Sequence, residues 1–210
     1  MNFGTTSTQL EQNKTANFVF GYGSLVNLKN LEQYLKRELN PDSDYVICSL
    51  KNWQRCWNVA MDNQVNLPEY KYYRDRATRQ RLEIFVAFLN LRPCLSKTIR
   101  GILFRVSDAE LANLDLRERN YQRIKIDDGL DLSVDGNVWT YIGTEEAKQR
   151  YQKGLSLNKV AIARDYSDSV ISAYESLGER ELAEYFATTE QAAIPLIDLE
   201  ICQTSSFSEA

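Results

Sequence analysis

The chain has 210 residues, of which 43% are hydrophobic and 26% are charged, a composition typical of a soluble globular domain. Its net charge of −4 excludes a global basic field that would attract nucleic acid or anionic lipid. It contains no histidine, which excludes Ser-His-Asp and Cys-His hydrolases in their standard form and metal sites built on imidazole. Acid–base chemistry would therefore need a carboxylate, tyrosine, lysine or cysteine whose pKa is shifted by its surroundings.

The sequence predicts a single domain over residues 17–200, between a flexible polar tail at residues 1–16 and a C-terminal tail at residues 201–210. The first residues lack the apolar segment of a signal peptide, and no apolar run approaches the roughly 18 residues of a membrane span. The four cysteines show neither CxxC spacing nor a metal-binding pattern, which is typical of reduced thiols. We therefore expect a cytoplasmic protein with no metal, cofactor, membrane or nucleic-acid partner; a homodimer remains open.

Four stretches in the first half of the chain are rich in β-branched, aromatic or other apolar residues and are predicted to be strands: residues 17–22, 45–61, 82–91 and 98–106. A bend is expected in the second of these strands near Asn52. Residues 27–39 carry leucines at helical spacing and precede Pro41, which predicts a helix there. Residues 62–81 are polar and irregular, and they are predicted to form a long loop.

In the second half of the chain, Ser107 and Glu110 have the spacing of a capping box, which predicts a short helix from Asp108. Further elements are predicted from the residue patterns: strands at 121–126 and 137–143, and helices at 158–177 and 179–189. Apolar residues follow helical spacing from Val160 to Leu177, and the rest of the chain is also predicted to be helical. Strands followed by helices predict an α+β fold with a largely antiparallel sheet or barrel.

Residues 20–25, FGYGSL, follow the first predicted strand. The stretch has neither the third glycine of a dinucleotide site nor the Gly-Lys-Ser/Thr of a Walker loop, and Ser24 has no histidine to activate it as a nucleophile. Two interpretations remain. Gly21 and Gly23 can end the strand in a turn, or they can supply the φ values and close approach that let backbone N–H groups form a nest for a carboxylate.

Residues 114–121, LDLRERNY, lie between the capped helix and the next predicted strand. Asp115, Arg117 and Glu118 can form an ordinary solvated turn. Side chains at a junction of helix and strand can also project into a pocket, and Tyr121 begins the strand.

These two stretches, in this order, resemble the γ-glutamylcyclotransferase-like superfamily, and VWTYIGT at 138–144 and IARDYSDSVI around Tyr166 are weaker similarities. The resemblance covers roughly residues 18–175. It is closest by motif to the ChaC-type branch, which is specific for glutathione. That branch has a Gln-Gly-Ser…Asp-His-Arg-Gly segment where this chain reads WNVAMDNQVNLPEYKYY, which argues against glutathione as the substrate.

The resemblance implies a small mixed or antiparallel β-barrel flanked by helices, with a helical C-terminal part. It implies a cofactor-free enzyme that converts a γ-glutamyl amine or peptide to 5-oxoproline and releases the amine. Glu118 would be the acid/base. The other site residues implied by the resemblance bind the substrate: Tyr22, Gly23, Ser24, Leu25, Tyr121 and Tyr166.

This chemistry suits a chain without histidine, because the substrate's own α-amine attacks its γ-carbonyl and no protein nucleophile is needed. A glutamate at its ordinary pKa is a poor base for an ammonium group, so Glu118 must be buried with a raised pKa. Other readings are a non-catalytic domain that binds an amino-acid-like ligand or a protein, and a hydrolase or ligase-like enzyme for γ-glutamyl bonds.

Residues 69–81, EYKYYRDRATRQR, mix basic and aromatic side chains as nucleic-acid contacts do. The acidic net charge favours a loop that caps the pocket or a subunit contact instead. As a cap, Arg74 and Arg76 would favour a substrate with a carboxylate beyond its γ-glutamyl group. Three tryptophans are expected to serve core packing only: Trp53, Trp57 and Trp139.

Overall fold

The computed structural model describes residues 15–41, 43–68 and 70–203. Seven strands within these ranges form one mixed sheet: β1 (Asn17–Gly21), β2 (Tyr45–Asp62), β4 (Phe85–Val106), β5 (Tyr121–Lys125), β6 (Asn137–Gly143), β7 (Val160–Ala163) and β8 (Leu196–Ile197). The order is β5-β6-β1-β4-β7-β8, and β2 also pairs with β4. No ladder among the described residues joins the two ends of this sheet.

The sheet is mixed because β1–β4, β2–β4 and β5–β6 pair antiparallel, whereas β1–β6, β4–β7 and β7–β8 pair parallel. Two further strands, β3 (Lys71–Asp75) and β9 (Leu199–Gln203), form a separate antiparallel pair. The helices are η1 (Ser24–Val26), α1 (Leu28–Leu35), α2 (Asp108–Arg117), α3 (Glu145–Ser156), α4 (Arg164–Leu177) and α5 (Glu179–Thr188). The predicted mixture of strands and helices is therefore confirmed.

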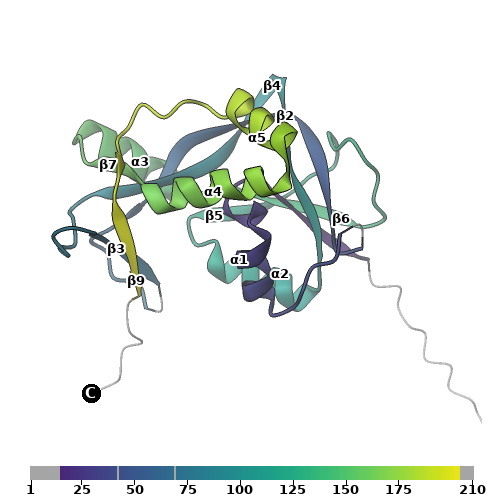
Figure 1. The fold of residues 1–210 in the computed structure, drawn as a ribbon, viewed down its shortest axis with the longest axis horizontal. Helices are drawn as coiled ribbons and strands as arrows, with labels where there is room; N and C mark the ends of the chain where they lie inside the picture. The colour runs from purple at the N-terminus through teal and green to yellow at the C-terminus, as the bar shows by residue number, and fades with distance from the viewer. Residues whose placement is uncertain (1–14, 42, 69, 204–210) are drawn as a thin grey trace, which may run out of the picture.

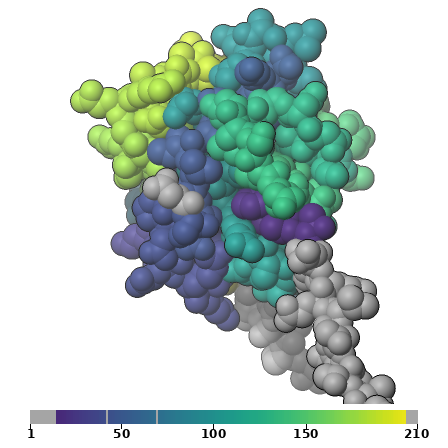
Figure 2. Space-filling view, turned by 90° about the vertical axis from the view of Figure 1, so that its right-hand side faces the viewer, coloured from purple at the N-terminus to yellow at the C-terminus, as the bar shows by residue number. Residues whose placement is uncertain are grey.

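Figure 1 shows how these elements are arranged. Helix α4 crosses the sheet in the middle of the view, α1 and α2 lie below it, and the β3–β9 pair stands at one end. Figure 2 shows a second face, on which the yellow-green C-terminal helices lie beside one end of the β2–β4 pair. None of the helices in the described ranges is both long and apolar enough to cross a bilayer.

Strands β2 and β4 form the long antiparallel backbone of the sheet. Asn52 has a left-handed φ of 67°, and the pairing register shifts between Lys51 and Trp53. Asparagine tolerates this conformation better than most residues, so the predicted bend near Asn52 is confirmed. The strands predicted at 82–91 and 98–106 are one strand, because residues 94–97 bulge out of the ladder without ending it.

The helix predicted over residues 158–177 is wrong at its start. Residues 160–163 form β7, which is buried throughout and pairs with β4, and α4 begins only at Arg164. A short apolar run does not reveal by periodicity whether it is a strand or a helix, and the parallel partner decides the matter here.

Four other predictions also need correction. Residues 62–81 are not all loop, because β3 pairs with β9, and the C-terminal part contains β8 and β9 as well as helices. Strand β9 extends into the range predicted to be a C-terminal tail, whereas residues 1–14 and 204–210 of the predicted tails lie outside the described residues. Helix α1 is shorter than predicted, because Lys36 caps it in the left-handed conformation with φ 57°.

The core lies around β1, whose Val19 and Phe20 are almost completely buried between β4 and β6. The neighbouring strand approaches closely because it carries a glycine. A Cβ atom at Gly101 would lie 2.2 Å from the carbonyl oxygen of Gly21. The stretch FGYGSL therefore leaves the sheet from a buried strand in its interior.

Candidate active site

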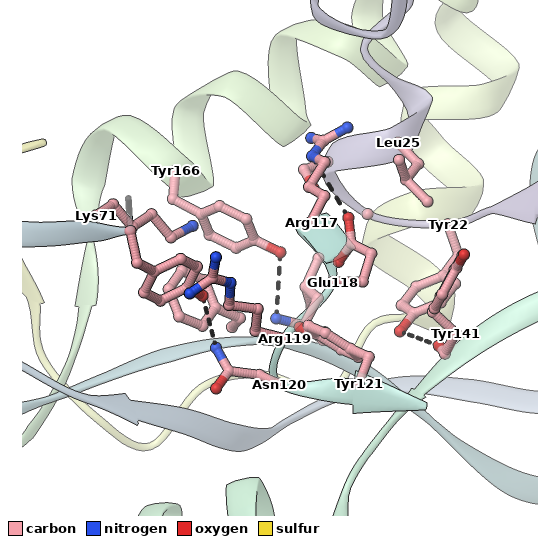
Figure 3. A pocket seen from close by; sticks show the side chains of 15 residues that line it. Tyr22, Leu25, Lys71, Arg117, Glu118, Arg119, Asn120, Tyr121, Tyr141 and Tyr166 are labelled. Atoms are coloured by element: carbon pink, nitrogen blue, oxygen red, sulfur yellow. Dashed lines mark hydrogen bonds and ion pairs between the residues drawn. The ribbon is translucent and has the colours of Figure 1, made fainter. Parts of the chain in front are cut away.

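A pocket opens where the chain leaves β1, between the α2–β5 junction, β3, β4 and α4. Together with the open space at its mouth it measures about 600 Å³, and it is lined by Tyr22, Gly23, Ser24, Leu25, Tyr70, Lys71, Phe88, Leu89, Arg117, Glu118, Arg119, Asn120, Tyr121, Tyr141 and Tyr166. Figure 3 shows these side chains converging from opposite ends of the sequence. All seven site residues expected from the sequence line this one pocket.

The loop of residues 22–25 forms one wall. The Tyr22 hydroxyl donates a hydrogen bond of 2.8 Å to the carbonyl of Tyr141 and fixes the ring. A Cβ atom on Gly21 would lie 2.9 Å from the Leu25 Cβ, so close approach explains this glycine. Neither Gly21 nor Gly23 has a positive φ, so a left-handed conformation does not account for these two glycines.

The backbone N–H groups of this loop remain free for a ligand. Among the described residues, none accepts a hydrogen bond from the N–H groups of Gly23, Ser24 or Leu25. A Cβ atom on Gly23 would have no contact closer than 3.5 Å, which is the hydroxyl oxygen of Tyr166. The pocket therefore borders unpaired donors on one side and a phenol on the other.

Glu118 stands at the C-terminal end of α2. The capping box of Ser107 and Glu110, predicted from the sequence, is present and fixes the start of the helix. The side chain of Glu118 is 13% exposed, and its Oε1 lies 3.5 Å from Nε of Arg117. Burial raises the pKa of the Glu118 carboxyl, and the charges of Arg117 and Lys71 only partly oppose that shift. This is the direction that a base for an ammonium group requires.

Tyr121 and Tyr166 both form hydrogen bonds with the backbone of Leu89 in β4. Tyr121 donates a hydrogen bond of 2.6 Å to the Leu89 carbonyl, and Tyr166 accepts one of 3.3 Å from the Leu89 N–H. The ring of Tyr166 packs edge-on against Phe88, with centroids 5.0 Å apart. Burial raises the pKa of both phenols, which therefore stay protonated at neutral pH.

At the opposite end of the pocket, Tyr70 and Lys71 come from the stretch 69–81 that the sequence analysis expected as a cap or a subunit contact, but neither residue was singled out there. In Figure 3, Lys71 and Arg119 lie on one side of Glu118, and Tyr22 and Leu25 lie on the other. The ammonium of Lys71 sits 4.6 Å from the centroid of the Phe88 ring. Burial lowers the pKa of Lys71 to about 8, although the charge of Glu118 opposes that shift.

Three residues of this wall, Tyr70, Arg119 and Asn120, contact one another. The guanidinium of Arg119 lies 5.0 Å from the ring centroid of Tyr70, and Asn120 donates a hydrogen bond of 3.2 Å to the Tyr70 hydroxyl. The only sequence signal for this wall was the basic and aromatic composition of residues 69–81.

The arginines of that stretch do not line the pocket. Arg74 forms an ion pair of 3.0 Å with Glu200, Arg79 also pairs with Glu200, and Arg76 pairs with Asp165. The idea that Arg74 and Arg76 cap the pocket is therefore not supported. These pairs instead tie β3 to β9 and α4, which places Tyr70 and Lys71 in the pocket.

Other expected features have clear positions. Trp57 is buried with its ring edge-on to Tyr166 at 6.1 Å between centroids, and the Trp139 indole donates a hydrogen bond of 2.9 Å to Asn17. Asp115 accepts a hydrogen bond of 2.8 Å from the Tyr141 hydroxyl outside the pocket. No group of three or more metal-ligating side chains occurs in the described part of the chain.

The sheet order and a pocket that opens beside its central strand define the class of fold. Among solved structures, a γ-glutamyl cyclotransferase matches with a TM-score of 0.50 and 8% identity, over 86% of this chain and 93% of that chain. The chain therefore has the γ-glutamyl cyclotransferase fold.

Two other structures are similar at lower scores. An uncharacterised human protein matches with a TM-score of 0.49 and 8% identity, over 86% of this chain and 94% of that one. A yeast γ-glutamyl cyclotransferase specific to glutathione matches with a TM-score of 0.46 and 12% identity, over 83% of this chain and 97% of that one. No protein-family model and no curated protein matches the sequence.

Proposed function

We propose that the protein is a cyclotransferase that converts a γ-glutamyl compound to 5-oxoproline and releases the amine. The observation that carries this proposal is the buried carboxylate of Glu118 with its raised pKa, in the same pocket as the free N–H groups of residues 23–25. A binding domain for an amino acid has no need of a carboxylate held in this state.

The proposed reaction forms one bond and breaks one bond. Glu118 takes a proton from the α-ammonium of the substrate, and the free amine attacks the γ-carbonyl carbon to close a five-membered ring. The bond between that carbon and the leaving nitrogen then breaks, and Glu118 returns its proton to the leaving nitrogen. The ring nitrogen loses a second proton as it becomes an amide, and the released amine takes up that proton and leaves as an ammonium ion. The N–H groups of the loop bind the α-carboxylate, while the neutral phenols of Tyr121 and Tyr166 line the site of reaction.

The charges of the pocket suit a leaving group that carries a carboxylate. Three cationic side chains, those of Lys71, Arg117 and Arg119, line the pocket with one acidic side chain, that of Glu118. Lys71 forms no ion pair within the described residues and packs on Phe88 instead. A γ-glutamyl amino acid or peptide would bring Lys71 a partner, which a γ-glutamyl amine would not.

The test is to incubate the purified protein with γ-glutamyl amino acids, γ-glutamyl amines and glutathione, and to identify products by mass spectrometry. Formation of 5-oxoproline supports the proposal. Formation of glutamate instead would indicate a hydrolase, and no product from any compound would favour a non-catalytic binding domain.

A further inference from the structure

Arg55 is a completely buried cation next to the pocket loop. It belongs to β2, and its guanidinium lies beside the stacked rings of Tyr174 and Tyr185, 4.9 Å and 5.4 Å from their centroids. Within the described residues no carboxylate pairs with it, and the nearby acid Glu181 pairs with Arg100 at 2.9 Å instead. A buried charge without an opposite charge is costly to the fold, so its hydrogen bonds need an explanation.

Those hydrogen bonds end on backbone carbonyls and hydroxyls. The Nε of Arg55 donates a bond of 2.9 Å to the carbonyl oxygen of Tyr22, the residue that begins the pocket loop. Its two terminal nitrogens reach the Thr188 hydroxyl, the Tyr174 hydroxyl and the carbonyl of Arg100. The Tyr174 hydroxyl has one proton, which it can donate to the same Tyr22 carbonyl oxygen at 2.9 Å or to the carbonyl oxygen of Arg100 at 3.0 Å. Two buried donors therefore converge on one peptide of the loop.

This arrangement has a geometric consequence. The peptide bond between Tyr22 and Gly23 is trans, because the described residues contain no cis peptide bond. In a trans peptide the C=O and N–H groups point in opposite directions. With the Tyr22 carbonyl held against the buried Arg55, the Gly23 N–H must face away from it, and Gly23 lines the pocket.

We propose that Arg55 is a positioning residue, which together with the Tyr174 hydroxyl turns the Tyr22–Gly23 peptide so that the Gly23 N–H faces the pocket and binds the carboxylate of the substrate. The hydrogen bonds to the carbonyl also polarise the peptide, which strengthens its N–H as a donor. The nature of the ligand rests on the proposed function; the orientation of the peptide does not.

The experiment compares two variants that each remove one buried hydroxyl. Tyr174→Phe removes a donor to the Tyr22 carbonyl. Thr140→Val is the control, because the fully buried Thr140 donates a similar bond of 2.9 Å to the carbonyl of Phe20, two residues earlier in the chain. With γ-glutamyl-alanine as substrate, Tyr174→Phe should raise KM about 3- to 10-fold and leave kcat within about twofold, since the lost interaction binds the ground state.

Thr140→Val should leave KM and kcat unchanged, even if its melting temperature falls as much as that of Tyr174→Phe. Arg55→Met should raise KM further. If Arg55→Met does not fold, the comparison of Tyr174→Phe with Thr140→Val still tests the proposal. A wild-type KM in Tyr174→Phe would overturn the proposal. So would an equal rise in KM in Thr140→Val, because a general loss of stability would then explain both.

A second readout does not depend on turnover. Protein labelled with ¹⁵N-glycine is titrated with 5-oxoproline and with L-glutamate, and the Gly23 amide resonance is followed by NMR. The proposal predicts that this resonance shifts in the wild type and that the apparent Kd is weaker in Tyr174→Phe but unchanged in Thr140→Val. If the Gly23 resonance responds in this way but the protein converts none of the γ-glutamyl compounds, the proposed cyclotransferase function is refuted and the proposed role of Arg55 is retained. No response of Gly23 to either compound would overturn that role.

Discussion

Substitution of Glu118 by Gln tests the proposed acid/base most directly, because the two side chains have nearly the same shape. General acid–base catalysis contributes about 10²- to 10⁴-fold to a rate, or about 3 to 5 kcal/mol of barrier. We therefore expect kcat for 5-oxoproline formation to fall by about that factor, while KM changes little. Full activity in the purified variant would refute the assignment.

The same substitution has an unusual expected effect on stability. The pKa of Glu118 is raised in the folded protein above its ordinary value of 4.5, so the folded state binds the proton more tightly than the unfolded chain does. Ionisation of Glu118 therefore costs stability, and that cost grows as pH rises from 4.5 through the raised pKa. Glu118→Gln removes the cost, so its melting temperature should exceed that of the wild type at pH 7.5. The difference should disappear towards pH 4.5.

Glu110 in the same helix provides a matched control of opposite sign. Burial raises its pKa, but hydrogen bonds from Ser107 and Arg37 outweigh that effect and lower the pKa overall. Its ionised form stabilises the fold above the ordinary pKa, so Glu110→Gln should lower the melting temperature at pH 7.5, and less at acidic pH. Thermal unfolding by circular dichroism over this pH range checks both signs. A Glu118→Gln variant less stable than the wild type at pH 7.5 would contradict the reasoning.

Three other outcomes follow from contacts described above. Gly101→Ala should lower the free energy of unfolding by about 2 kcal/mol or more in denaturant titrations, because the new methyl meets the Gly21 carbonyl at 2.2 Å. Gly23→Ala should raise KM, since its methyl would point towards the Tyr166 hydroxyl at 3.5 Å; an unchanged KM would place the substrate elsewhere. Lys71→Met should reduce kcat/KM about tenfold for γ-glutamyl-alanine and hardly at all for γ-glutamyl-alaninamide. Equal losses on the two substrates would show that Lys71 does not contact the leaving group.

The parts of the pocket that could be predicted from the sequence depend on local patterns. FGYGSL follows a buried strand, and LDLRERNY comes at the end of a capped helix. The sequence could therefore predict that Tyr22 lies just after a strand and Glu118 at the end of a helix. The order of these stretches indicated the fold, which the comparison with a solved cyclotransferase confirms. The role of each residue in catalysis stays a prediction.

The parts that could not be predicted depend on contacts between distant segments. Lys71 enters the pocket because β3 pairs with β9, and nothing near residue 71 reveals that partner. Val160 and Ala163 fit a helical spacing, yet β4 makes them part of a strand. Arg55 gave one unused signal, since it is a charged residue that lies between Trp53 and Trp57 in a predicted strand.

The pairing of β3 with β9 also bears on how the site is assembled during synthesis. Residues 71–75 emerge from the ribosome long before residues 199–203, which supply the other strand of the ladder. A nascent chain can therefore already contain the loop of residues 22–25 and Glu118 while the strand that carries Lys71 still has no partner. The proposed contact between Lys71 and the leaving group can therefore form only after residues 199–203 have been synthesised, later than the residues of the two motifs.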